Sequence, residues 1–249
     1  MLFRSTLALF IAFIAPTWGL AQAPANWQSP ERAKLLEGVT TVPKLGSPGP
    51  VAVWGNLAFP VLAAADGGKA ELALAAAAAY AKGRAMIFGQ NAYIDGASMS
   101  NGGAGTLLVN AVRWVGNKDK PSVGTSSAGL ADFLKGKGFR AEKLKGPLEK
   151  KNLNDYDVVI VNAQGITSDE EGEAVMDFIK GGGGFIAGMT GWAFEQTSGG
   201  KTLSVAHGLN QAMMPMGIAF TDASGFGSAG FREFQARVEL PKMMNAFEA

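Results

Sequence analysis

The chain has 249 residues, of which 47% are hydrophobic, and a formal net charge of +1. This length and composition suffice for one sizeable α/β domain with extensions, or for two small domains. A nearly neutral chain lacks the electrostatic signature of nucleic-acid or acidic-membrane binding, so no nucleic-acid partner is expected. The sequence contains no cysteine, which excludes disulfides and a cysteine-linked lipid anchor.

The first 23 residues have the pattern of an export signal. Arg4 supplies the positive charge, residues 7–15 form a short apolar core, and residues 21–23 (Ala-Gln-Ala) form a small-x-small cleavage site. The apolar core is too short to span a bilayer. We therefore expect cleavage after Ala23, a secreted or periplasmic protein, and no stable membrane span once the leader is removed.

Residues 24–50 are rich in Pro, Gly and Ser around one short helical patch at 30–37. Pro43, Pro48 and Pro50 interrupt regular structure there, which predicts a tether. Short β-like segments follow at 51–55, 59–65, 71–80 and 84–89, and indicate a small β-rich part over 51–100. The alanine run within 71–80 also suits a helix, but the Lys82-Gly83 pair after it favours a hairpin.

Residues 103–222 have an α/β pattern that follows the β-rich part. After a largely apolar helix at 103–116, expected strands at 122–127, 139–144, 157–162 and 185–188 alternate with helices at 128–137 and 168–180. Ser168 and Glu171 form a capping box at the start of the last helix. This alternation predicts a flavodoxin-like or glutaminase-like, doubly wound, mostly parallel sheet. Residues 223–249 are expected to form an extension, with a helix from Pro241 that leads to a further domain.

Polar side chains follow several of the expected parallel strands, where ligands bind in open α/β sheets. Hydroxyl, amide and indole groups there suit a neutral polar ligand such as a sugar, although ordinary polar loops have the same composition. These candidate ligand-binding residues are Ser126, Ser127, Gln164, Thr190 and Trp192.

Other polar groups are better explained by structure than by chemistry. His207 is the single histidine, so no metal site is expected and it is interpreted as a surface or turn residue; no cofactor is expected either. The carboxylates at 169–173 are typical of the first turn of a helix. The glycine run at 181–184 precedes a strand, whereas phosphate-binding loops follow a strand and open a helix.

Three passages of the chain resemble one known family. Residues 79–94 (AYAKGRAMIFGQNAYI), 106–115 (TLLVNAVRWV) and 157–194 resemble the N-terminal class I glutamine-amidotransferase-like module of TRP-channel-associated factors and enhancin-type (gluzincin, mucin) peptidases. In the related trehalose-utilisation-like proteins the first two motifs follow the sheet core, whereas here they precede it. The resemblance covers residues 45–249 and implies the glutaminase-like fold.

The resemblance also bears on catalysis. Glutaminases of this fold use a cysteine nucleophile on a strand-to-helix elbow with a histidine base. Thr190 stands at the elbow and Gln90 stands where relatives often have histidine, so these two are the candidate catalytic residues. The side chain of glutamine cannot accept a proton at neutral pH, so Gln90 cannot act as a base. A glutamine in place of the histidine base is typical of a pseudoenzyme.

The resemblance therefore implies a non-catalytic accessory module that binds or positions a partner for an exported enhancin-type peptidase. The peptidase motif His-Glu-x-x-His is absent from these 249 residues, and a C-terminal peptidase domain would belong to a longer protein. A glycan or glycoprotein is the expected partner. Two alternatives stay open: an atypical small-molecule hydrolase with Thr190 in its site, and a stand-alone carbohydrate-binding protein.

Overall fold

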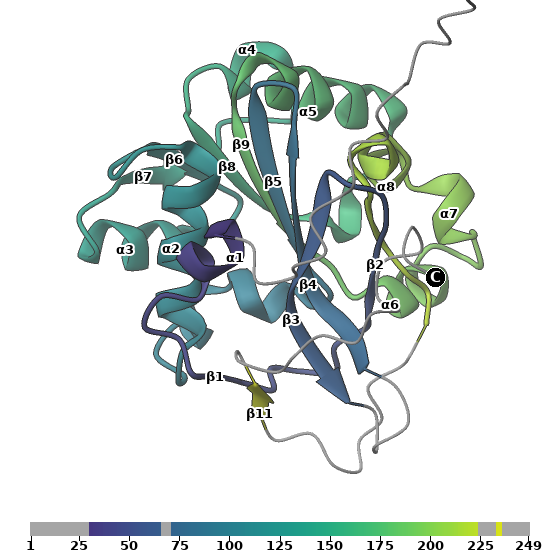
Figure 1. Cartoon of the computed structure of the whole chain (residues 1–249). Helices are drawn as coiled ribbons and strands as arrows, with labels where there is room; N and C mark the ends of the chain where they lie inside the picture. Colours follow the sequence, from purple (N-terminus) through teal and green to yellow (C-terminus); the bar gives the residue numbers. More distant parts are fainter. Residues whose placement is uncertain (1–29, 66–70, 224–232, 236–249) are drawn as a thin grey trace, which may run out of the picture.

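The computed structural model describes residues 30–65, 71–223 and 233–235 as a three-layered α/β domain (Figure 1). The expected leader at 1–23 lies outside the described residues, as do most of the expected extension and its helix from Pro241. Within the described residues, no helix is long and apolar enough to cross a membrane.

The central layer is a seven-stranded sheet with the spatial order β3-β4-β5-β9-β8-β6-β7. All strands from β5 to β7 in this order run parallel, whereas β4 is antiparallel to both of its neighbours. The prediction of a mostly parallel α/β sheet is thus confirmed. The strands are β3 (Ala58–Ala65), β4 (Glu71–Tyr80), β5 (Gly83–Phe88), β6 (Ser122–Thr125), β7 (Arg140–Lys143), β8 (Val158–Asn162) and β9 (Gly184–Gly188).

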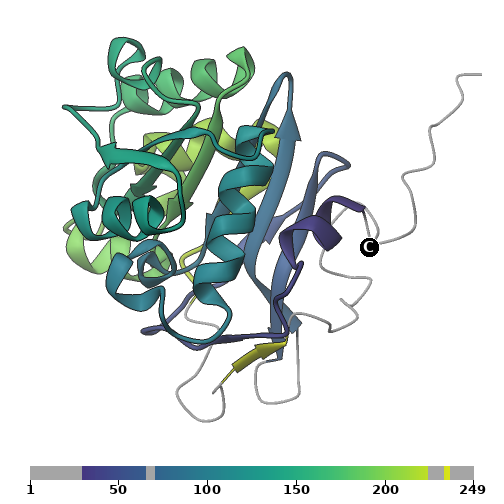
Figure 2. The ribbon, with the colours of Figure 1, turned by 90° about the vertical axis from the view of Figure 1, so that its left-hand side faces the viewer.

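Helices cover both faces of this sheet and enclose two separate hydrophobic cores. Figure 2 shows α2 lying across one of the two faces, which we call the first face. The first face carries α1 (Pro30–Leu35), η1 (Asn91–Ile94), η2 (Gly96–Ser98), α2 (Ala104–Gly116) and α3 (Ala128–Gly136). The second face carries α4 (Lys150–Leu153), α5 (Asp169–Gly181), α6 (Gly191–Thr197), α7 (Leu203–Ala206), α8 (Gly208–Met213) and a two-stranded ribbon of β2 (Val51–Val53) and β10 (Ile218–Phe220). The remaining elements are β1 (Thr41–Pro43), η3 (Ala163–Gly165), η4 (Met214–Met216) and β11 (Glu233–Gln235), which pairs with β1.

Local signals in the sequence set the ends of α5. The hydroxyl of Ser168 accepts a hydrogen bond from the backbone N–H of Glu171 at 3.1 Å, as the capping box predicts. The carboxylate of Glu171 accepts from Leu148 N–H at 3.4 Å, so it joins the helix to the preceding loop. The helix ends at Gly182, whose φ of 113° is a left-handed conformation that favours glycine.

The expected β-rich part at 51–100 contains strands β2 to β5, but β3 to β5 belong to the same sheet as the parallel strands and do not form a segment before the core. The alanine run is strand β4, as the hairpin signal predicted, and it pairs directly with β5 of the parallel sheet. Its residues from Ala75 to Ala78 are completely buried, with alternate side chains in the two cores. Small side chains at these positions let β2 and β10 pack closely over the sheet on one side.

The expected tether is also wrong for residues 30–50, which are packed into the domain. Four apolar side chains of this segment lie in the first core: Leu35, Val39, Val42 and Leu45. The guanidinium of Arg32 is itself buried and donates to the carbonyl of Val61 in β3 at 3.3 Å. Proline and glycine do interrupt regular structure in this segment, but irregular backbone can still be firmly packed when its apolar side chains have a core to enter.

Candidate functional site

The parallel strands bring four of the predicted site residues to one edge of the sheet. Gln90 follows β5, Thr190 follows β9, Gln164 follows β8 and Ser126 follows β6. Because β5, β9, β8 and β6 are neighbours in this order, the four residues lie in the same order along the carboxyl edge. This edge is where open α/β sheets bind ligands.

The two candidate catalytic residues are in direct contact. The Thr190 hydroxyl donates to the side-chain oxygen of Gln90 at 2.9 Å, across 100 residues of sequence. Both are buried, with exposed fractions of 8% and 7%. The same Gln90 oxygen accepts from the backbone N–H of Ala92 at 3.4 Å and so caps η1.

The turn that holds Thr190 has the form of a strand-to-helix elbow. Thr190 lies between β9 and α6 with an extended backbone conformation. Gly191 follows it because a Cβ at that position would collide with the carbonyl oxygen of Thr221. Thr190 thus stands at a turn from a strand into a helix.

The contact between Thr190 and Gln90 is nevertheless not a nucleophile–base pair. A hydroxyl becomes a good nucleophile when a neighbouring base accepts its proton. Here the proton points at an amide oxygen, which is not basic at neutral pH. The bond fixes the orientation of both side chains and leaves the hydroxyl unactivated.

His207 lies in the turn between α7 and α8, as one of its two expected interpretations had it, but it is buried and not on the surface. Its exposed fraction is 0%, its Nε2 lies 2.8 Å from the carbonyl oxygen of Ala163, and its Nδ1 accepts from the backbone N–H of Asn210 at 3.1 Å. These partners require a neutral ring with its proton on Nε2. Burial lowers the pKa of His207, while the bond to Ala163 acts in the opposite direction. Since both nitrogens bind the backbone, His207 has a structural role.

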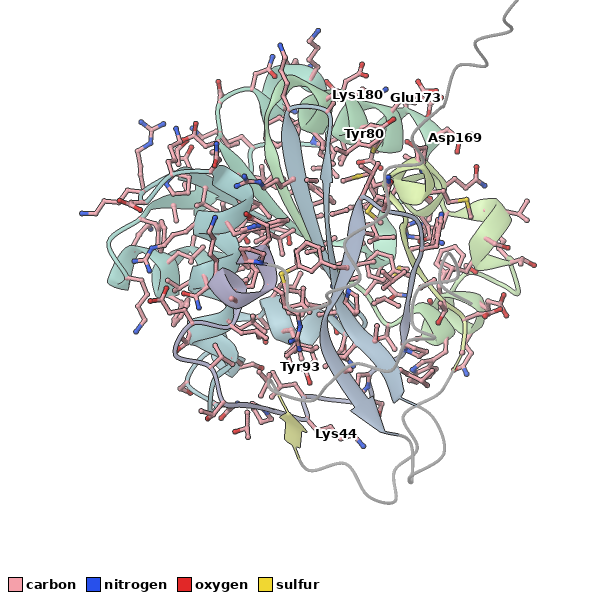
Figure 3. The ribbon with its side chains drawn as sticks, viewed as in Figure 1. Lys44, Tyr80, Tyr93, Asp169, Glu173 and Lys180 are labelled. Atoms are coloured by element: carbon pink, nitrogen blue, oxygen red, sulfur yellow. The ribbon has the colours of Figure 1, made fainter. Side chains whose placement is uncertain are left out.

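Residues 45–50 cross the carboxyl edge directly above the elbow, and we name them the strap. The backbone N–H of Gly49 donates, at 2.8 Å, to the backbone carbonyl of Gly89, which directly follows β5. The indole N–H of Trp192 donates to the carbonyl of Ser47 at 3.1 Å. At the beginning of the strap, the backbone N–H of Leu45 donates to the hydroxyl of Tyr93 at 3.1 Å. Figure 3 labels Tyr93 at this edge, together with Lys44, the residue that precedes the strap.

The predicted ligand-binding residues fall into two groups along the edge. Trp192, half-buried, lies with Thr190 under the strap. Farther along, Gln164 donates to the hydroxyl of Thr197 at 3.4 Å, which joins the end of β8 to α6. Ser126 is exposed and accepts from the backbone N–H of Asn162 at 3.1 Å.

Ser127 has a local structural partner. Its hydroxyl accepts from the backbone N–H of Leu130 at 3.3 Å and so caps α3. The sequence signal for this role was available, since serine directly before a helix is a preferred capping residue. Ser127 is therefore less available to a ligand than Ser126.

Two residues of this region were missed by sequence reasoning. Ser47 lay in the expected tether, and nothing in the sequence indicated that its carbonyl would meet Trp192. Asn210 is buried and binds both polar backbone groups of Phe220. Its place in the apolar sequence before β10 was a signal, because a buried amide needs hydrogen-bond partners. Among residues 30–65, 71–223 and 233–235, no three acidic or histidine side chains form a group that could hold a metal.

Comparisons with known proteins agree with this architecture. Two solved structures share the fold: IMPa from Pseudomonas aeruginosa in complex with an O-glycopeptide, and IMPa metallopeptidase in complex with T-antigen. The TM-score is 0.58 for both, at 16% and 15% sequence identity. The matches cover 78% and 81% of this chain, but only 22% and 23% of those chains.

Curated relatives are similar over most of this chain. TRPM8 channel-associated factor 2 of Bos taurus is 29% identical over 213 residues, which are 84% of this chain and 21% of the relative. The Homo sapiens protein of the same name is 30% identical over 196 residues, or 77% of this chain and 19% of the relative. The chain thus spans about a fifth of the length of these relatives. A family model described as TRPM8, N-terminal domain (TCAF_N), matches residues 14–231, and the chain therefore belongs to this TCAF N-terminal domain family.

Proposed function

We propose that this domain is a non-catalytic recognition or positioning module of an exported, enhancin-type peptidase-like protein. The observation that carries the proposal is the buried bond between Thr190 and Gln90, in which the hydroxyl at the elbow faces an amide and not a base. The strap across the same edge supports it, because the contacts of Gly49 and Ser47 cover the elbow. In this proposal the glutaminase-like elbow is kept as a scaffold.

The expected partner is a glycan or glycoprotein. The structural neighbours are IMPa bound to an O-glycopeptide and IMPa metallopeptidase bound to T-antigen. The names of the curated relatives associate them with the TRPM8 channel. Both sets of names are compatible with a shared domain that docks another macromolecule. On this chain, half-buried Trp192 and Gln164 at the carboxyl edge supply an aromatic surface and an amide for a neutral sugar.

Binding of an O-glycopeptide to the purified protein tests the recognition role. We expect binding without cleavage, and a loss of affinity of about tenfold or more in Trp192→Ala, as for an aromatic anchor. Trp54→Ala is the matched control, since Trp54 is also half-buried but follows β2, at the end of that strand away from the strap. If no glycopeptide or free glycan binds, or if both variants weaken binding equally, recognition at this edge is ruled out.

Mass spectrometry of the same mixtures tests the catalytic alternative. We expect an intact glycopeptide with the unmodified protein and with Thr190→Ala. Cleavage that disappears in Thr190→Ala would replace our proposal with a hydrolase. Reading the gene beyond Ala249 tests the peptidase partner: an in-frame His-Glu-x-x-His supports it, and a stop codon directly after Ala249 contradicts it.

A further inference from the structure

A pocket of about 730 Å³ lies at the amino ends of the parallel strands, on the sheet edge opposite the strap. Its walls are the turn between β4 and β5, the end of α2, α4 with the loop before β8, and the end of α5. Figure 1 shows the β4–β5 turn beside α4 and α5 at the top of the view, and Figure 3 labels Tyr80 and Lys180 there. The pocket volume is in the range of small-molecule sites.

The glycine run at 181–183 leaves this pocket open. Gly182 ends α5 with its left-handed φ of 113°, a conformation that favours glycine. A Cβ on Gly183 would collide with the ring of Phe178, which lies over that backbone. The connection from α5 to β9 therefore has no side chain that could fill the space, and the Phe178 ring becomes part of the wall.

The acidic groups of the pocket already have cationic partners. The carboxylate of Asp157 binds the ammonium of Lys118 at 2.7 Å and the backbone N–H of Ser122 at 2.7 Å. Asp177 lies 3.6 Å from the ammonium of Lys180. Lys118 and Lys180 also lie at the carboxyl ends of α2 and α5, where positive charge offsets the helix dipoles.

What is left in the pocket is an excess of hydrogen-bond donors. Lys82, from the β4–β5 turn, and Lys150, from the start of α4, line the pocket and form no ion pair with any described residue. Asn117 and Asn154 line it too, and the side-chain oxygen of Asn117 already accepts from Arg84 at 3.0 Å. Two ammonium groups from separate elements, together with two amides and an aromatic ring, match a ligand that is rich in acceptors and has an apolar face.

We propose that this pocket binds a small carboxylate-bearing ring compound, with its carboxylate between Lys82 and Lys150 and its ring against Phe178. Charge-assisted bonds to the two lysines would supply the orientation, and the phenyl ring would supply the apolar contact. A sugar acid and an aromatic acid share this chemistry. The site lies outside the carboxyl edge, so it is independent of the glycan-binding role proposed above.

Amide NMR of the purified protein tests the site with three probes: D-glucuronate, benzoate and D-glucose. We expect at least one acid to cause saturable shifts of the backbone amides of residues 181–183, whereas D-glucose, which lacks the carboxylate, does not. A saturable response to glucuronate alone identifies a sugar-acid site, and a response to benzoate alone identifies an aromatic-acid site. Binding should weaken with added salt, because a surface-accessible charge pair is screened.

The lysine variants connect the shifts to the pocket. Lys82→Ala with Lys150→Ala should weaken acid binding tenfold or more, while Lys135→Ala should not change it, because Lys135 is an exposed lysine of α3 paired with Asp132. The proposal is overturned if neither acid gives saturable shifts at millimolar concentration, if the double variant binds like the unmodified protein, or if glucose binds as well as glucuronate. Since Trp192→Ala does not alter this pocket, failure of glycopeptide binding would leave these results unaffected.

Discussion

The side chain of Asn210 makes the two hydrogen bonds to the backbone of Phe220 that a neighbouring strand would otherwise make. Its amide oxygen accepts from the backbone N–H of Phe220 at 2.7 Å, and its amide nitrogen donates to the Phe220 carbonyl at 3.3 Å. Phe220 lies opposite Val51 in the β2–β10 ribbon. The backbone hydrogen bond from Trp54 to Gly217 fixes which opposite pairs of the ribbon are hydrogen-bonded, and the Phe220–Val51 pair is not one of them. The backbone N–H and carbonyl of Phe220 therefore point away from β2. Asn210 thus satisfies two buried backbone groups that the ribbon cannot.

Asn210→Leu should therefore destabilise the domain by about 2–4 kcal/mol, because it leaves the N–H and the carbonyl of Phe220 buried without partners. Urea denaturation gives the free energy of unfolding. Asn154→Leu is the control, since Asn154 is exposed at the end of α4, and its effect should stay within about 0.5 kcal/mol. A loss below about 1 kcal/mol in Asn210→Leu would show that water or a shifted strand supplies the missing bonds.

Acid should weaken the fold through His207. Because the folded pKa lies below the unfolded value of about 6.5, the unfolded chain binds more protons between the two values. The stability that comes from neutral His207 is complete above pH of about 6.5 and is lost as the pH falls from there through the folded pKa. The cause is structural: a protonated ring cannot accept the Asn210 N–H at Nδ1.

This dependence can be isolated because the chain has a single histidine. Free energies of unfolding, measured by urea between pH 7.5 and pH 5, should fall more steeply for the unmodified protein than for His207→Gln, which has no imidazole. The variant is expected to be less stable at neutral pH, so the slope and not the absolute value is the readout. Parallel slopes would contradict a role for His207.

Gly89→Ala should separate the strap from the sheet. A Cβ at position 89 would collide with the carbonyl oxygen of Gly49, and both positions are backbone that cannot rotate away. We expect a loss of about 2 kcal/mol or more in urea denaturation. Gly136→Ala is the matched control: a Cβ there meets no atom within 4 Å, and within α3 alanine should be neutral or stabilising. Equal effects would mean that the strap moves without cost.

Much of the fold could be predicted because it depends on short-range patterns. The apolar run of β8, the capping serine of α5 and the hairpin after β4 each identify an element from a few neighbouring residues. The packing of residues 30–50 could not be predicted in the same way. Leu35 and Val42 are separated by turns and prolines, and only the completed sheet offers them a core.

The candidate site was predicted in outline but not in chemistry. Thr190 and Gln90 were singled out from the family resemblance, and the structure places them in contact. That Thr190 would be covered depended on Ser47, whose contact with Trp192 spans 145 residues, and on Gly49, which binds the backbone at Gly89. The burial of His207 was not foreseen, because a lone histidine in sequence carries no information about the carbonyl of Ala163, 44 residues away.

The strap also determines when folding can finish. Its last carbonyl, on Pro50, accepts a hydrogen bond from the hydroxyl of Thr221, a residue 171 positions later. Contacts of such high sequence separation form late, since the closure of a long loop precedes any stabilisation they give. The strap can bind Gly89 and Tyr93 earlier, but this bond at its end forms only after the chain has been synthesised through Thr221.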